Sequence, residues 1–319
     1  MKNILLIGIG GTGAHTAELL QRKIKEYGKQ TDNRIATLLF DTDAEQISSA
    51  RGGLVLDATD SATVGTVCDR LGHSRLSTWF PAKDESVRAE DLHRGSAAWR
   101  KKALLCLHNM LNDRRSAEIF HNELERFAAF PFAKSYDVYF VGSLAGGTGA
   151  GLLLPLALYT KRFLSKFHFS TGPRFYAMLS CPDIYADNAD TDNATRYFAN
   201  AYAALRELNA INLVAHGYNG KAPSRRAKEK ERKNDPAIFR LESPNPEEVS
   251  GVLFDASEEK FQKVTSMPFR TVYLLDRIAG VRTVAEHEEA LADSLYTLTC
   301  TKAEGMFDNL TASADTERS

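Results

Sequence analysis

Two glycine-rich segments have the composition of a backbone that can hold phosphate groups. The first reads GIGGTG at residues 8–13, and the second reads AGGTGAG at residues 145–151. Each follows a short apolar run and precedes a segment with helical spacing, so backbone N–H groups and the positive end of a helix dipole can meet an anion there. Two such segments would clamp an extended polyphosphate from both sides. The predicted contacts are Gly10, Gly11, Thr12, Gly13, Ala145, Gly146, Gly147, Thr148 and Gly149.

The acid Asp41, which follows an apolar run at residues 35–40, leaves a second interpretation open. In a dinucleotide-binding protein, Gly8, Gly10 and Gly13 would hold the pyrophosphate and Asp41 would bind the ribose. Such a protein needs only one glycine-rich segment, so the second segment favours a polyphosphate held from two sides. The sequence lacks a Walker A motif, which excludes the P-loop family.

Alternating strands and helices must position these segments. This alternation predicts an α/β fold with a doubly wound, mostly parallel sheet, helices on both faces, and ligands at the carboxyl ends of the strands. We predict strands at 2–7, 35–40, 54–56, 136–141, 174–179 and 272–275. We predict helices at 13–27, 97–111, 117–130, 152–167, 193–208 and 284–306. Residues 59–94 are interpreted as a long connection with a helical turn or two, and 142–151 as a loop.

Composition narrows the function classes. The chain has 319 residues, 43% of them hydrophobic, and a net charge of −1, which gives no general attraction to nucleic acid or anionic lipid. Its four cysteines are scattered, as suits a reducing cytoplasm. No apolar run is long enough to span a membrane. His15 and His287 are interpreted as surface residues of helices.

A charged segment interrupts the alternating pattern at about residues 217–268, and we interpret it as an insertion. Its basic run at 221–233 is a solvated loop or a site for an acidic partner. The run contains no aromatic residues on which bases could stack, which argues against nucleic acid as the partner.

The two glycine-rich segments together resemble those of the tubulin and FtsZ family. The second segment is similar to the family signature GGGTG followed by a small residue and glycine, with Ala145 in place of the first glycine and Ala150 as the small residue. The sequence DTDA at 41–44 resembles the family's NTDA, whose acid lies near the phosphates and the metal. The resemblance covers about residues 1–306 outside the insertion, and it is closer to a divergent bacterial branch than to FtsZ itself. It implies GTP or GDP as ligand, with Mg²⁺ near Asp43.

The resemblance also implies contacts to the rest of the nucleotide. Residues 94–99, RGSAAW, fall where the family has its γ-phosphate loop, and Trp99 is similar to the tubulin version. Residues 182–196 resemble the ribose-contacting segment, in which Asp192 and Arg196 keep the spacing of an acid and an arginine in FtsZ.

Two further positions concern the base. Arg277 falls where the family places a base-contacting Asn, and Asp293 matches the aspartate that accepts hydrogen bonds from guanine. A buried carboxylate that faces two donors would select guanine over adenine. On composition alone, Asp192, Arg196 and Asp293 are equally well explained as solvated surface charges.

The resemblance finally implies how hydrolysis would be completed. In the family, acids from the next subunit of a filament activate the attacking water, and Asp315 and Glu317 are the candidates for that role here. The sequence ends at Ser319, so we expect no second domain of the family within it: either it is part of a longer protein, or the protein is a nucleotide-binding module without the usual filament partner. We therefore expect one domain over 1–319, slow GTP hydrolysis and no long filaments from this chain alone.

Three classes of function stay open at this point. The first is a GTPase that assembles head to tail with itself into filaments. The second is a GTP-binding switch or scaffold that does not polymerise. The third is a Rossmann-type NAD-binding or adenylating enzyme.

Overall fold

The computed structural model describes residues 1–29, 32–43, 54–57, 63–72, 76, 80–92, 95–130, 133–215, 267–277 and 280–301. These residues form a sheet of six parallel strands with helices around it. The strands are β1 (Lys2–Ile9), β2 (Arg34–Asp41), β3 (Leu54–Asp57), β4 (Ser135–Ser143), β5 (Arg174–Ser180) and β6 (Thr271–Leu275). The helices are α1 (Gly10–Tyr27), α3 (Val64–Leu71), α5 (Glu85–Arg88), α6 (Arg100–Asn112), α7 (Arg114–Ala128), α8 (Gly147–Leu164), α9 (Asp183–Ala186), α10 (Thr191–Ala215) and α13 (Val284–Cys300).

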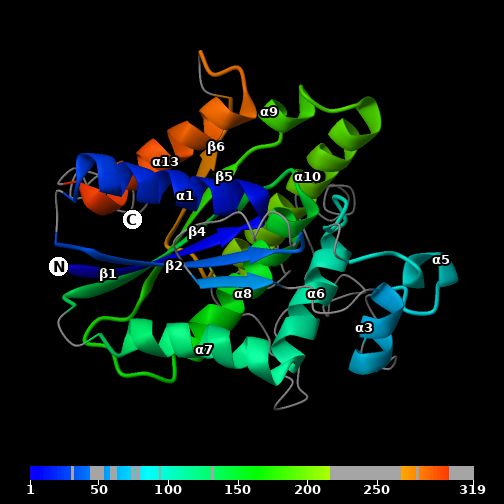
Figure 1. Ribbon diagram of the computed structural model, residues 1–319, viewed down its shortest axis with the longest axis horizontal. Coiled ribbons are helices and arrows are strands. Elements are labelled where there is room, and N and C mark those ends of the chain that lie inside the picture. Colours follow the sequence, from blue (N-terminus) through cyan, green and yellow to red (C-terminus); the bar gives the residue numbers. More distant parts are fainter. Residues whose placement is uncertain are drawn as a thin grey trace, which may run out of the picture.

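The strand order is β3-β2-β1-β4-β5-β6. The chain therefore begins in the middle of the sheet, winds outward to β3, and returns to place β4 on the other side of β1 (Figure 1). In doubly wound sheets, ligands bind in the crevice at the carboxyl ends of the strands on either side of this reversal. Both glycine-rich segments follow the two strands at the reversal, β1 and β4.

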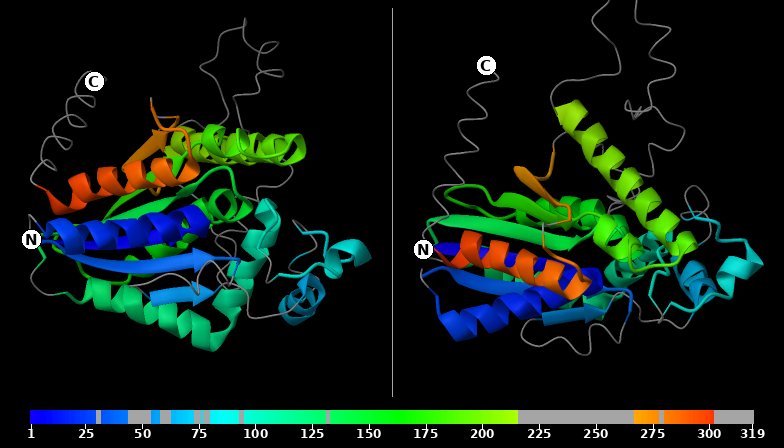
Figure 2. Two further views of the ribbon diagram at one scale, coloured as in Figure 1. Left: turned by 45° about the horizontal axis from the view of Figure 1, so that its top comes forward. Right: turned by 90° about the horizontal axis from the view of Figure 1, so that it is seen from above.

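Alternation along β1 divides the core into two layers. Ile4 and Leu6 join a buried cluster with α1 and α13 on one face. Leu5, Ile7 and Ile9 join a larger cluster with α3, α6, α7, α8 and α10 on the other face. Successive side chains of a strand point to opposite faces. A strand with an unbroken apolar run, such as residues 4–7 of β1, is therefore expected to be buried on both faces. Figure 2 shows α1 and α13 side by side on their face.

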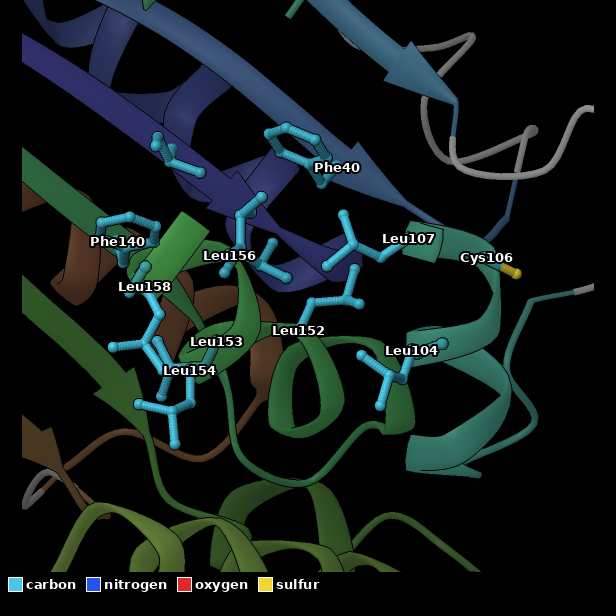
Figure 3. Packing of buried hydrophobic residues seen from close by; sticks show 14 of the residues in the cluster. Phe40, Leu104, Cys106, Leu107, Phe140, Leu152, Leu153, Leu154, Leu156 and Leu158 are labelled. Carbon is cyan, nitrogen blue, oxygen red and sulfur yellow. The ribbon is translucent and has the colours of Figure 1, made fainter. Parts of the chain in front are cut away.

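Helix α8 lies at the centre of the larger cluster. Leu152, Leu153, Leu154, Leu156 and Leu158 are all buried (Figure 3), because the sheet lies on one side of α8 and α6, α7 and α10 cover the others. A helix that is apolar all round is expected in such a position. This packing fixes the first turn of α8 against the end of β4.

The predicted fold class is confirmed, and the predicted strands and long helices are all present. The main difference lies in the glycine-rich segments, in which the loop is short: only residues 144–146 lie between β4 and α8. Helix α1 begins at Gly10 and helix α8 at Gly147, so several glycines occupy first helical turns. The connection at 59–94 also contains two short helices, α3 and α5. Helix α6 starts only at Arg100 because Ala97 and Ala98 have φ of 49° and 59°, outside the right-handed helical region.

Two predicted features fall largely on parts of the chain outside the described residues. These are the insertion, of which only 267–268 are described, and the end of the chain from residue 302. The structure therefore gives no account of the basic run at 221–233, a candidate site for an acidic partner, or of the candidate catalytic acids Asp315 and Glu317. Among the described helices, none is both long and apolar enough to cross a bilayer.

Candidate functional site

A cavity of about 680 Å³ opens at the carboxyl ends of β1 and β4. Its volume lies in the usual range for sites that bind small molecules or cofactors. The wall is built from segments far apart in the chain that the strand reversal brings together. It is lined by Ile9, Gly10, Gly11, Thr12, His15, Asp41, Asp43, Ser96, Ala97, Ala98, Ser143, Ala145, Gly146, Gly147, Thr148, Gly149, Tyr185, Asn193, Arg196, Tyr197 and Glu288.

Two helix N-termini meet side by side in this wall. A Cβ built on Gly10 would lie 3.6 Å from the backbone nitrogen of Gly149, so the first turns of α1 and α8 are adjacent. Neither helix has a side-chain cap or an acidic residue in its first turn. By contrast, α3, α5, α7 and α13 each begin at a Thr or Asp whose side chain accepts a backbone N–H. The donors and dipoles of α1 and α8 are therefore left for an anion in the cavity.

The glycines of these helices are needed chiefly for close packing. A Cβ on Gly149 would lie 2.1 Å from the carbonyl oxygen of Ser143, and one on Gly13 would lie 2.4 Å from that of Val141. Both helices thus approach β4 more closely than any side chain allows. Gly146, the residue before α8, is different because nothing lies within 4 Å of the Cβ position.

Three buried hydroxyl groups connect the first turn of α8 to the turn after β2 and to the loop before α6. Thr148 Oγ1 lies 2.6 Å from Thr42 Oγ1 and 3.2 Å from Ser96 Oγ. Asp41 shapes the turn that carries Thr42, since its Oδ1 accepts the backbone N–H groups of Thr42 at 2.7 Å and of Asp43 at 3.2 Å. This Asx turn places Asp43 in the cavity wall.

The loop before α6 forms another part of the wall and is held in a strained conformation. Ala97 and Ala98 both have positive φ, which is unfavourable for residues that carry a Cβ. Asn200 of α10 donates to the carbonyl oxygens of Ala98 and Ala145, at 2.9 Å in both cases. One buried amide therefore joins this loop, the second glycine segment and α10.

A carboxylate from α13 completes the wall. Glu288 is 7% exposed, and its Oε2 lies 2.5 Å from His15 Nδ1 of α1. Burial raises the pKa of Glu288, and hydrogen bonds from His15 and Thr12 oppose this effect. Thr12 Oγ1 also lies 3.0 Å from the hydroxyl of Tyr185, which comes from α9.

Residues 5–317 match the sequence pattern of a family described as Tubulin like. The chain belongs to this tubulin-like family. The resemblance to tubulin and FtsZ is thereby confirmed. The comparison with curated proteins gives no match.

Solved structures similar to this tubulin-like chain include three proteins. A protofilament of CetZ2 from Haloferax volcanii with GTPγS bound has a TM-score of 0.46 and 15% identity, over 92% of this chain and 56% of that chain. A GTPγS-form protofilament of TubZ from Bacillus thuringiensis serovar israelensis has a TM-score of 0.43 and 13% identity, over 93% and 55%. A mutant FtsZ from M. jannaschii has a TM-score of 0.35 and 16% identity, over 73% and 52%. The chain spans about half the length of these proteins.

The structure brings most of the predicted contacts of the tubulin-like chain to one cavity. Those in the wall are Gly10, Gly11, Thr12, Asp41, Asp43, Ala145, Gly146, Gly147, Thr148, Gly149 and Arg196. Gly13 lies behind the wall, where it packs against Val141. Asp192 is exposed in the first turn of α10 and does not line the cavity, whereas Asn193 beside it does.

Two residues predicted to contact the base lie outside the cavity wall. Arg277 forms an ion pair with Asp187. Asp293 is 62% exposed and forms an ion pair with Lys23 at 2.8 Å. Five residues along a helix correspond to a rotation of about 140°, so Asp293 and Glu288 lie on different faces of α13. Of these two acids of α13, Glu288 is buried and lines the cavity, and Asp293 does not.

Several residues in or beside the site were not found from the sequence. Asn200 and Glu288 lie on helices without a motif, and no local signal distinguishes them from surface residues. His287 was expected on the surface but is fully buried, with Nε2 2.6 Å from Ser180 Oγ at the end of β5. Trp99 does not line the cavity, because its ring stacks on Phe80 with centroids 5.4 Å apart.

Proposed function

We propose that this chain binds a guanine nucleoside triphosphate in the cavity at the ends of β1 and β4. The observation that carries the proposal is the meeting of two helix N-termini without side-chain caps, α1 and α8, in one cavity wall. Each supplies backbone N–H donors and a partial positive charge. A triphosphate carries enough negative charge and length to use both. Membership of the tubulin-like family supports the same ligand.

Magnesium fits the site as a partner of the phosphates, not as a resident metal. The described residues contain no group of three or more His, Cys, Asp or Glu side chains that could hold a metal ion. Mg²⁺ is commonly bound by one or two carboxylates together with phosphate oxygens and waters. We assign Asp43 to this role because its carboxylate belongs to the cavity wall near the hydroxyls of Thr42 and Thr148. Bound Mg²⁺ would neutralise phosphate charge.

Glu288 is our candidate for reading the base. Guanine presents two adjacent donors, N1–H and the 2-amino group, whereas adenine has an acceptor at N1 and no 2-amino group. An ionised carboxylate accepts both guanine donors. Asp41 and Asp43 belong to the turn beside Thr148, whereas Glu288 reaches the wall from α13. Asn193, Arg196 and Tyr197 of α10 are the candidates for contacting the ribose.

Competition binding tests this assignment. Labelled GTP is displaced by unlabelled GTP or ATP in the wild type, in Glu288→Gln and in Asp293→Asn. Both variants replace a carboxylate of α13 with an amide, but only Glu288 faces the cavity. We expect GTP to bind in preference to ATP, and Glu288→Gln to weaken GTP by about 1–3 kcal/mol while Asp293→Asn leaves it unchanged. Equal displacement by ATP in the wild type would rule out guanine selection.

We further propose that the bound nucleotide is hydrolysed slowly unless a second copy docks head to tail, with Asp315 and Glu317 as candidate acids. Family membership supports this step. The test is turnover per molecule over a range of protein concentrations: a steep rise together with sedimented polymer would support completion of the site by a second copy and overturn the expectation that this chain alone forms no long filaments. A rate that does not depend on concentration would contradict assembly-linked hydrolysis.

A GTP-binding switch that does not polymerise is the second candidate, and one observation favours it. The strained loop at Ala97 and Ala98 is tied through Asn200 to α10. Strain of this kind is often stored where a ligand changes a conformation. In that case turnover would not depend on concentration, but protease sensitivity near residues 95–98 would differ between GTP and GDP.

A further inference from the structure

His15 and Glu288 form a pair that joins α1 to α13 inside the cavity wall. Both line the cavity, and His15 Nδ1 lies 2.5 Å from Glu288 Oε2. Glu288 is 7% exposed, whereas the His15 side chain is 46% exposed. The histidine therefore lies between a buried carboxylate and the solvent-filled part of the site. A buried carboxylate stays ionised only when donors surround it.

We infer that His15 is a positioning residue for Glu288, which keeps the carboxylate ionised and correctly turned, so that the preference for guanine depends on pH. This inference rests on the proposed function, because it concerns how the same site reads the base. The contact with His15 uses Oε2, and a carboxylate offers about four acceptor positions. His15 can therefore stay in place while the carboxylate accepts donors of the base.

The surroundings of Glu288 identify the groups that can affect its ionisation. From α1 they are His15 and Thr12, and from α9 the hydroxyl of Tyr185. On α13 itself the neighbours are His287 and Glu289. The His287 ring is held by Ser180, and Glu289 is neutralised by Lys23 and Arg22. Of the groups that hydrogen-bond to Glu288, His15 is the one that can carry a positive charge.

The sign of the pH dependence follows from this environment. Burial raises the pKa of Glu288 and the hydrogen bond from His15 lowers it. Guanine requires the ionised form, so the preference for guanine is present at high pH and is lost as pH falls through the pKa of Glu288. Removing His15 removes a stabilising contact of the ionised form. The pKa of Glu288 then rises further, and the loss of preference occurs at a higher pH.

The experiment compares GTP with inosine triphosphate, which lacks only the 2-amino group. The two ligands share the triphosphate, the ribose and the Mg²⁺, so effects of pH on the phosphate end of the site cancel in the ratio of their dissociation constants. The ratio is measured between about pH 4 and pH 8, which covers the ordinary pKa of Glu, about 4.3, and the higher values to which burial shifts Glu288. The proteins are the wild type, His15→Ala, His15→Gln and Glu288→Gln. Glutamine at position 15 can donate to Glu288 but does not titrate.

We expect the preference for GTP in the wild type to fall on the acid side, and His15→Ala to move this fall to higher pH. A shift of one pH unit would lower the preference about tenfold on the acid limb, since one pKa unit is a tenfold change in ionised fraction. His15→Gln should move the profile part of the way back toward that of the wild type. Glu288→Gln should abolish both the preference for GTP and its pH dependence. The same profile in wild type and His15→Ala would overturn the inference while leaving GTP binding intact. Failure of the wild type to bind GTP at any pH would instead overturn the proposed function, and the inference with it.

Discussion

Gly146 offers the sharpest test of the phosphate site, because a side chain there changes the cavity without changing the core. Its backbone is extended, with φ of −74° and ψ of 155°, a conformation that valine adopts readily. The added Cβ would meet nothing within 4 Å, and Gly146 lines the cavity beside the first turn of α8. Gly146→Val therefore fills space that a phosphate would occupy.

The expected magnitudes separate binding from stability. The valine should remove at least one hydrogen bond to a charged phosphate, worth about 1.5–3 kcal/mol, which weakens GTP about tenfold to 150-fold. The free energy of unfolding should fall by no more than about 1 kcal/mol, the usual size of a preference at the residue before a helix. Gly149→Ala should behave oppositely, because its Cβ would lie 2.1 Å from the Ser143 carbonyl oxygen. We expect it to lower stability by about 1–3 kcal/mol or more.

The assay combines GTP titration with urea unfolding for each variant. Gly172→Val is the matched control, since its Cβ also meets nothing within 4 Å but it lies before β5, at the opposite end of the sheet from the cavity. It should change neither quantity. If Gly146→Val folds normally and binds GTP with unchanged affinity, the cavity is not the phosphate cradle and the reasoning fails.

Three further outcomes are expected. Asp43→Asn should remove most of the gain in GTP affinity that Mg²⁺ gives over EDTA, and an unchanged gain would exclude Asp43 as the metal contact. Arg174→Ala should lower the free energy of unfolding by about 1.5–3 kcal/mol, measured in urea, because the buried Asp137 accepts from Arg174 at 2.7 and 2.9 Å, while Lys2, 3.3 Å from Asp137, still pairs with it after the change. A loss below about 1 kcal/mol, typical of exposed pairs, would contradict this. Burial lowers the pKa of His287, so its contribution to stability is present above the unfolded-state value of about 6.5 and is lost as pH falls through the lowered value. His287→Asn should accordingly flatten the decline of urea midpoints below pH 6.5, and an identical decline in both proteins would refute this assignment.

The sequence determined the fold class and the glycine-rich end of the cavity, where we propose that phosphate binds. Unbroken apolar runs followed by glycines predict buried parallel strands that lead directly into helices, and this pattern is local. Gly13, Gly147 and Gly149 are also readable in sequence, because a Cβ at these positions would lie only 2.1–2.5 Å from neighbouring atoms. Family resemblance added the turn of Asp41 and Asp43. This turn could be predicted because it directly follows β2 in the chain, so its position depends on local sequence alone.

Only the tertiary structure decided the other end of the site. Glu288 and Asp293 are both acids on α13, and the sequence favoured Asp293. Their surroundings differ because of the rotation of α13 against α1, where Lys23 forms an ion pair with Asp293 while His15 contacts Glu288. Asn200 likewise gains its position from the packing of α10 on α8. Which face of a helix turns inward depends on contacts between residues more than 200 positions apart, such as 15 and 288, and spacing along the chain carries no record of them.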